Sequence, residues 1–68
     1  MDFYDEKSRE IKEKLEAGEE GFRIFNPGNC RSVKIDHRTP YRYHMIKGTM
    51  LADITDNVYE AVKYLMGG

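Results

Sequence analysis

Apolar residues recur at helical spacing near the start of the chain. The stripe holds three apolar residues with a serine in the gap between them: Tyr4, Ser8, Ile11 and Leu15. Spacing of three or four residues places such side chains on one face of a helix, so the pattern predicts a helix over residues 3–17. Asp2 is placed to cap its first turn, and Gly18 is a natural stop after its last turn. The stripe is narrow, so we expect this helix to be polar over most of its surface.

A wider apolar stripe lies near the end of the chain. Its members again recur at helical spacing: Val58, Ala61, Val62 and Leu65. They predict a second helix over residues 56–66, with Thr55 or Asp56 as the N-terminal cap. Gly67 and Gly68 follow and end it, because glycine accepts the left-handed backbone that often closes a helix.

Alternating apolar and polar residues predict a β-hairpin after the first helix. Its strands cover residues 22–26 and 31–36, on either side of a turn that contains Pro27 and Gly28. A tight turn pairs Phe22 with Val33 and Ile24 with Arg31. One face of this hairpin then holds Phe22, Ile24, Val33 and Ile35. The opposite face holds Arg23, Phe25, Cys30, Ser32 and Lys34.

A second hairpin is predicted at residues 41–47 and 50–54. Gly48 and Thr49 form its two-residue loop, and glycine in the first position fits a type II′ turn. The resulting register pairs Tyr43 with Ile54, His44 with Asp53, Met45 with Ala52, and Ile46 with Leu51. The core side then holds Tyr41, Tyr43, Met45, Ala52 and Ile54. The other side holds Arg42, His44, Ile46, Leu51 and Asp53.

These elements predict a small α+β protein with the order α-β-β-β-β-α. We expect residues 1–68 to form a single domain, in which an antiparallel sheet of about four strands packs against two helices on one face. A chain of 68 residues buries only about 60% of its unfolded surface, so its core is marginal. Its single cysteine cannot form an internal disulfide. Self-association is another source of stability for small scaffolds, so we expect a homodimer.

Charge is distributed unevenly although the net charge is only -1. Residues 1–20 carry eight acidic and four basic side chains. Residues 31–47 carry five basic side chains against the single acid Asp36, and they also contain both histidines. The local potential around the two hairpins is therefore positive, and such potentials steer partners.

The basic region is the first candidate binding site. Its bases are Arg31, Lys34, Arg38, Arg42 and Lys47, and they alternate with Tyr41, Tyr43 and His44. Cations bind phosphates and rings stack on bases, so this mixture is typical of a site for a nucleotide or for single-stranded nucleic acid. On the predicted register the two tyrosines point toward the core, away from Arg42 and His44. The competing interpretation is a solvated sheet face.

A second candidate site is apolar. Phe25, Cys30, Ile46 and Leu51 fall on the sheet face that neither helix is expected to cover. An exposed apolar patch of this kind usually marks an interface with another molecule. If the helices instead lie on opposite faces of the sheet, the same residues would be buried.

Catalytic and metal-binding patterns are weak. Cys30, His37 and His44 have the spacing C-x6-H-x6-H, which matches no zinc site with closely spaced ligand pairs. The sequence places no third group to orient a cysteine-histidine pair, so we interpret Cys30 as a small apolar residue. A pairing of His44 with Asp53 is interpreted as a cross-strand stabiliser. We therefore expect no metal, no cofactor and no enzymatic activity.

The function predicted from these observations is a small non-enzymatic interaction module that docks on another macromolecule, with a protein the expected partner. It would act as a regulator or inhibitor, a role common among small phage and mobile-element proteins, although no motif here indicates that origin. The alternative is a binder of nucleotide or single-stranded nucleic acid through residues 31–47. The N-terminus is acidic and the apolar runs are short. We therefore expect no membrane association and a cytoplasmic location.

Overall fold

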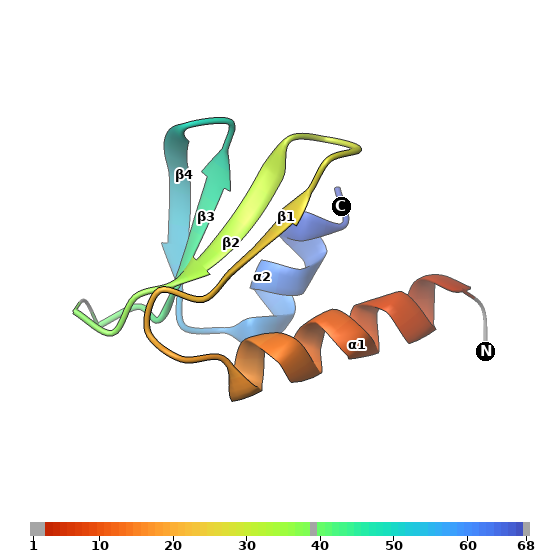
Figure 1. Cartoon of the computed structure of the whole chain (residues 1–68), viewed down its shortest axis with the longest axis horizontal. Helices are drawn as coiled ribbons and strands as arrows, with labels where there is room; N and C mark the ends of the chain where they lie inside the picture. Colours follow the sequence, from red (N-terminus) through yellow and green to blue (C-terminus); the bar gives the residue numbers. More distant parts are fainter. Residues whose placement is uncertain (1–2, 39, 68) are drawn as a thin grey trace.

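The fold is the predicted α+β arrangement (Figure 1). A computed structural model describes residues 3–38 and 40–67 of the chain, with side chains described from residue 6. The elements follow in the order α1 (Phe3–Ala17), β1 (Arg23–Asn26), β2 (Arg31–Ile35), β3 (Tyr43–Lys47), β4 (Met50–Thr55) and α2 (Val58–Leu65). The four strands form one sheet in the order β1-β2-β3-β4, and each neighbouring pair is antiparallel.

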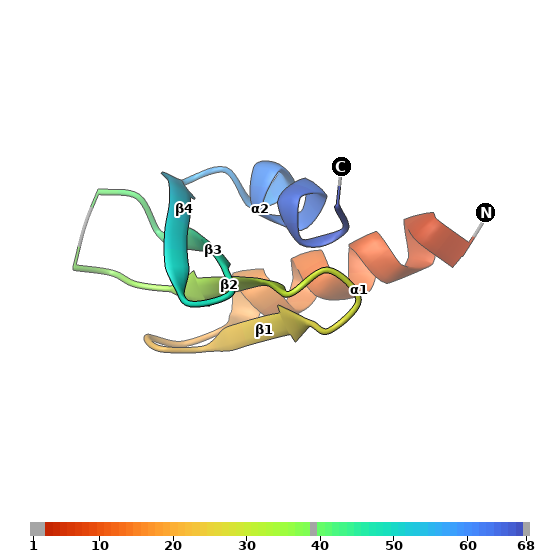
Figure 2. The same cartoon turned by 90° about the horizontal axis from the view of Figure 1, so that it is seen from above.

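Both helices lie on the same side of the twisted sheet (Figure 2). Helix α2 packs against β2, β3 and β4, and α1 packs against α2. The expectation that one face of the sheet is covered is confirmed. No described helix or loop forms a second layer over the opposite face, which we call the outer face.

The core lies between the two helices and the inner face of the sheet. Its fully or almost fully buried apolar residues are Ile11, Leu15, Val33, Ile35, Tyr43, Met45, Ala61, Val62 and Leu65. Both predicted helix faces are therefore confirmed where they are described, since Ile11 and Leu15 come from α1 and three members come from α2. The side chain of Tyr4 and the proposed cap Asp2 lie outside the described residues.

The first hairpin has the predicted faces but a different register. Ile24 pairs with Val33, not with Arg31, so the strands are shifted by two residues. The predicted turn at residues 26–29 forms, since the N–H of Asn29 donates to the carbonyl of Asn26 at 3.4 Å. The register expected from a tight turn does not form, because the loop has four residues, 27–30, and ends on Cys30 in a left-handed conformation with φ of 60°. A shift of two residues returns each side chain to the same face, so Val33 and Ile35 still reach the core.

The second hairpin departs from prediction beyond its turn. Ile46 pairs with Leu51 as predicted, and Gly48 has a φ of 61° as a type II′ turn requires. A β-bulge next to Met45 then leaves Ala52 unpaired and shifts the register by one residue. The predicted core positions of Ala52 and Ile54 are therefore wrong. Tyr41, also expected in the core, precedes β3 and is 44% exposed.

Helix α2 begins at Val58, two residues later than predicted, and its cap is neither Thr55 nor Asp56. Asn57 is the cap, and its Oδ1 accepts a hydrogen bond from the backbone N–H of Tyr59 at 2.9 Å. Thr55 supports this end, because its hydroxyl accepts from the N–H of Asn57 and donates to Glu60. At the other end Gly67 has a φ of 89°, which confirms it as a helix stop. Gly68 lies outside the described residues.

Candidate interaction surface

Two cross-strand rows cover the outer face of the sheet. The observed registers place side chains from all four strands opposite one another in each row. One row is apolar apart from its serine and consists of Phe25, Ser32, Ile46 and Leu51. The other row consists of Arg23, Lys34, His44 and Ile54. Side chains of neighbouring strands lie about 5 Å apart in such rows, so each row forms a continuous surface.

The apolar row is exposed at its two ends and more deeply buried at its centre. Phe25 is 51% exposed and Leu51 is 58% exposed, whereas Ile46 is half-buried. Ser32 is fully buried between its larger neighbours, and its hydroxyl has no hydrogen-bond partner among the described residues. Phe25 and Ile46 flank the buried serine on either side, so the row presents apolar surface with little polar interruption. Cys30 is also exposed, but it lies in the loop before β2.

The second row is cationic, and sequence reasoning named Lys34 and His44 as binding residues but not Arg23. Arg23 is exposed, and Lys34 and His44 are half-buried. Across both rows, the eight outward positions of the strands include no carboxylate. The four-residue loop and the bulge decide which residues meet, and neither feature has a clear signal in the sequence.

Two arginines of the predicted basic site hold helix ends. Arg31 donates from Nη1 to the backbone oxygen of Tyr64 at 2.9 Å and stacks on the Tyr64 ring at 4.6 Å from its centroid. Arg42 donates from Nη2 to the backbone oxygen of Gly18 at 3.1 Å. Carbonyls at a helix C-terminus lack partners within the helix and carry partial negative charge. Both guanidinium groups therefore stabilise the fold.

Arg38 is held in another way, by the carboxylate of Asp36. Its guanidinium donates to both carboxylate oxygens, at 3.0 and 2.8 Å. The backbone N–H of Arg38 donates to the same carboxylate at 2.9 Å. The pKa of Asp36 is therefore held well below its ordinary value of 3.8, chiefly by the side-chain hydrogen bond from Arg38.

The five predicted bases consequently do not form one surface. Arg31 and Lys47 are paired at the end of the sheet where the hairpin loops lie, whereas Arg38 and Arg42 flank the loop at the opposite end. Lys34 lies between them in the cationic row of the outer face. Lys34 is the only one of the five that shares a face with Phe25, Ile46 and Leu51, and the predicted site residue His44 lies on the same face.

The pairing of Asp36 with Arg38 predicts that the difference in stability between wild type and Arg38→Ala depends on pH. A lowered pKa means that the folded state favours the ionised carboxylate, and this stabilisation is lost as pH falls from 3.8 through the folded-state pKa. Arg38→Ala should therefore have a lower Tm than wild type at pH 7, and the gap should close below pH 4. Thermal melts between pH 7 and pH 2 measure this, with Lys47→Ala as control. A gap that stays constant in acid would contradict it.

The structure does not bring Cys30, His37 and His44 together as a catalytic group. Cys30 precedes β2 and His37 follows it, so the length of this strand separates them. The imidazole of His37 lies 3.4 Å from the Glu20 carboxylate. In residues 3–38 and 40–67, no three His, Cys, Asp or Glu side chains are grouped as metal ligands. The predicted pairing of His44 with Asp53 is wrong, because the bulge places Ile54 opposite His44.

Comparison of the chain with protein families, with curated proteins and with solved structures finds no match. Within the described residues, neither helix has the length and apolar character needed to cross a membrane. Any functional inference therefore depends on the surface itself.

Proposed function

We propose that this chain is a non-enzymatic interaction module that docks on a partner protein through the outer face of its sheet and so regulates or inhibits that partner. The observation that carries this proposal is the apolar row across all four strands, exposed at Phe25 and Leu51 on the face opposite both helices. Exposed aromatic and aliphatic side chains of an apolar patch are typical anchors of protein interfaces.

The charges beside the apolar row define the chemistry of the partner. Arg23 and Lys34 lie next to Phe25 and Ser32 on β1 and β2, and no carboxylate shares their face. A partner surface with apolar side chains bordered by Asp or Glu would complement both rows. Complementary charges increase the association rate, and burial of the apolar row slows dissociation.

The same cations also support the alternative, a binder of nucleotide or single-stranded nucleic acid. Binding of that kind usually combines cations with several rings on which successive bases stack. The eight outward strand positions hold two rings, Phe25 and the half-buried His44, and Tyr43 is buried in the core. The ratio of apolar to aromatic side chains therefore favours a protein partner.

Leu51→Glu is expected to abolish partner capture without unfolding the chain. The leucine is 58% exposed, so a carboxylate there stays solvated in the free protein but is buried in the complex. Tyr59→Glu is the matched control, because Tyr59 is 66% exposed on α2, away from the outer face. The measurement is capture from nuclease-treated native extract with each immobilised variant. We expect a loss of at least about tenfold for Leu51→Glu alone.

Three results would overturn the proposal. Equal capture by Leu51→Glu and Tyr59→Glu would exclude the outer face. Capture that occurs in untreated extract but is lost after nuclease treatment would indicate a nucleic acid as the partner. The third result is sedimentation of the isolated chain as a species heavier than 8.0 kDa that Leu51→Glu dissociates. It would identify a second copy as the occupant of this face, in line with the predicted homodimer.

A further inference from the structure

Strand β1 lies at the edge of the sheet, and half of its backbone groups face away from β2. The carbonyl of Phe22 accepts a hydrogen bond from the N–H of Ile35 at 2.8 Å, so Phe22 faces β2. Backbone groups of successive residues in an antiparallel strand point to opposite edges. Ile24 therefore faces β2, whereas the N–H and C=O groups of Arg23 and Phe25 face outward. These two residues offer two donors and two acceptors to a further strand.

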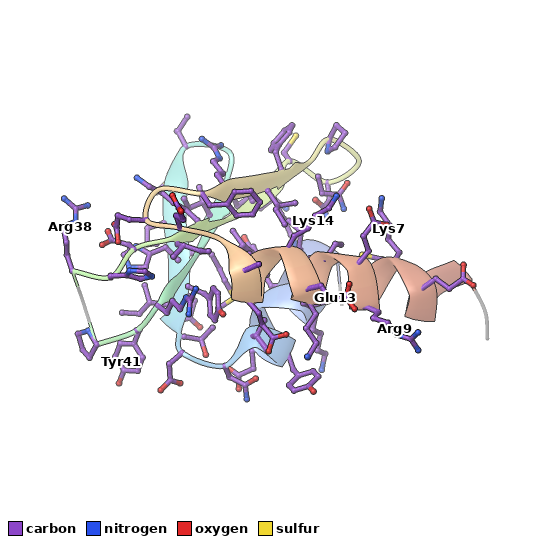
Figure 3. The ribbon with its side chains drawn as sticks, turned by 60° about the horizontal axis from the view of Figure 1, so that its bottom comes forward. Lys7, Arg9, Glu13, Lys14, Arg38 and Tyr41 are labelled. Atoms are coloured by element: carbon purple, nitrogen blue, oxygen red, sulfur yellow. The ribbon has the colours of Figure 1, made fainter. Side chains whose placement is uncertain are left out.

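A groove runs beside this edge, between β1 and α1. Its volume is about 530 Å³. Its apolar lining comes from α1, β1 and the end of α2 and includes Ile11, Ile24, Leu65 and Met66. The α1 side is formed by Lys7, Glu10 and Lys14. Figure 3 shows Lys7 and Lys14 extending from α1 on the side nearer β1, whereas Arg9 extends on the other side. The groove therefore combines an apolar floor with charged walls.

Positive charge predominates around the groove. Among the described residues that line it, the cations are Lys7, Lys14 and Arg23, and the one carboxylate is Glu10. Glu10 is already neutralised by Lys14, whose Nζ lies 3.0 Å from Oε1. The pKa of Glu10 is lowered, first by the hydrogen bond from Lys14 and then by the charges of Lys14 and Lys7. This local excess of cations contrasts with the net charge of -1 for the whole chain.

We propose that this edge binds an extended acidic segment of a partner protein, which adds to β1 as a fifth strand. The segment's backbone would pair with Arg23 and Phe25. Because side chains alternate along a strand, every second side chain would enter the groove over Ile24, where acidic ones would meet Lys7 and Lys14, and the side chains between them would lie on the outer face beside Arg23. The site stands apart from the outer-face proposal, since it uses the edge of β1 and its inner side. A protein partner could engage either or both.

The test uses a random library of ten-residue peptides displayed on phage and panned on the folded full chain. The peptides selected should be rich in Asp and Glu alternating with apolar residues. A synthetic copy of the most enriched peptide, titrated into labelled protein, should shift the backbone amides of Arg23 and Phe25 and the methyl groups of Ile11 and Ile24. The same two amides should exchange more slowly with solvent in the complex, because binding provides them with acceptors.

Arg23→Pro is the decisive variant. Proline removes the outward N–H but leaves the hydrogen bonds of Ile24 to β2, so an edge strand tolerates it. We expect a loss of peptide affinity of at least about tenfold, with Arg23→Lys as the matched control that retains binding. Lys7→Glu, which leaves β1 unchanged, should weaken the acidic peptide at least about fivefold, and this variant decides the outcome if Arg23→Pro is poorly folded.

Leu51→Glu separates this proposal from the proposed function. It should leave peptide affinity unchanged, because Leu51 lies on β4 at the opposite edge of the sheet. Failure to select any peptide, a selected set without acidic enrichment, or shifts confined to the outer face would overturn the inference. Protection of the Arg23 and Phe25 amides that grows with protein concentration in the absence of peptide would also overturn it, because a second copy would then occupy the edge.

Discussion

Val62→Asp is expected to unfold the chain, whereas Lys63→Asp leaves it folded. Val62 is 6% exposed in the centre of the inner face of α2, and the next residue along the helix is exposed. An unpaired carboxylate in this core costs several kcal/mol. A domain of this size has only about 5 kcal/mol of stability at the low end of the usual range. The charge at Val62 therefore removes most or all of it.

Circular dichroism and thermal melts of the two variants measure this effect. Lys63→Asp is the matched control, because it introduces the same side chain one position away on the solvent side of the same helix. Wild type and Lys63→Asp should both show a cooperative transition, and Val62→Asp should show none. Similar melting temperatures for the two variants would contradict the assignment of the helix face.

Gly18→Ala is expected to destabilise the fold even though alanine is the better helix former. A Cβ at this position would lie 2.5 Å from Cδ1 of Ile35 and 2.7 Å from Cδ2 of Phe22. Ile35 is fully buried, so it has little room to move. Overpacking of this kind typically costs about 1 to 3 kcal/mol. Gly18 is thus needed for the close approach of the end of α1 to β2.

Urea denaturation at neutral pH measures the loss for Gly18→Ala. Gly28→Ala is the control, since its Cβ would meet only the side-chain oxygen of Asn26 at 3.2 Å, in an exposed loop. We expect the midpoint to fall clearly for Gly18→Ala and to change little for Gly28→Ala. Equal midpoints would show that Ile35 and Phe22 rearrange without cost.

Because Arg31 and Arg42 bind helix ends, replacing them is not a clean test of binding by the basic region. Arg42 is half-buried and donates to carbonyls at the end of α1, so Arg42→Glu would place a carboxylate against them. A loss of partner binding in the Arg42→Glu variant could then not be distinguished from a loss of its folding stability. Lys34→Glu is the more informative change, because no helix end depends on Lys34 and it lies in the cationic row of the outer face.

Local patterns in the sequence were sufficient to predict the helices and strands and most of their buried faces. The helical spacing of Ile11 with Leu15 predicted one core face, and the spacing of Ala61 and Val62 with Leu65 predicted the other. The alternation of Val33 and Ile35 did the same for β2. Periodicity is a property of a single segment, so it remains visible without knowledge of the other segments. The order α-β-β-β-β-α and the exposed apolar residues Phe25 and Leu51 followed from it.

The tertiary structure alone decided how these segments meet. The left-handed backbone of Cys30 and the bulge at Ala52 set the strand registers, and both depend on how loops and edges pack. The roles of Arg31 and Arg42 depend on helix ends brought beside them from distant parts of the chain. The registers also created the cationic row, and the strand order placed β1 at an edge of the sheet. The sequence therefore determined which surfaces are apolar, and long-range packing decided which charges surround them.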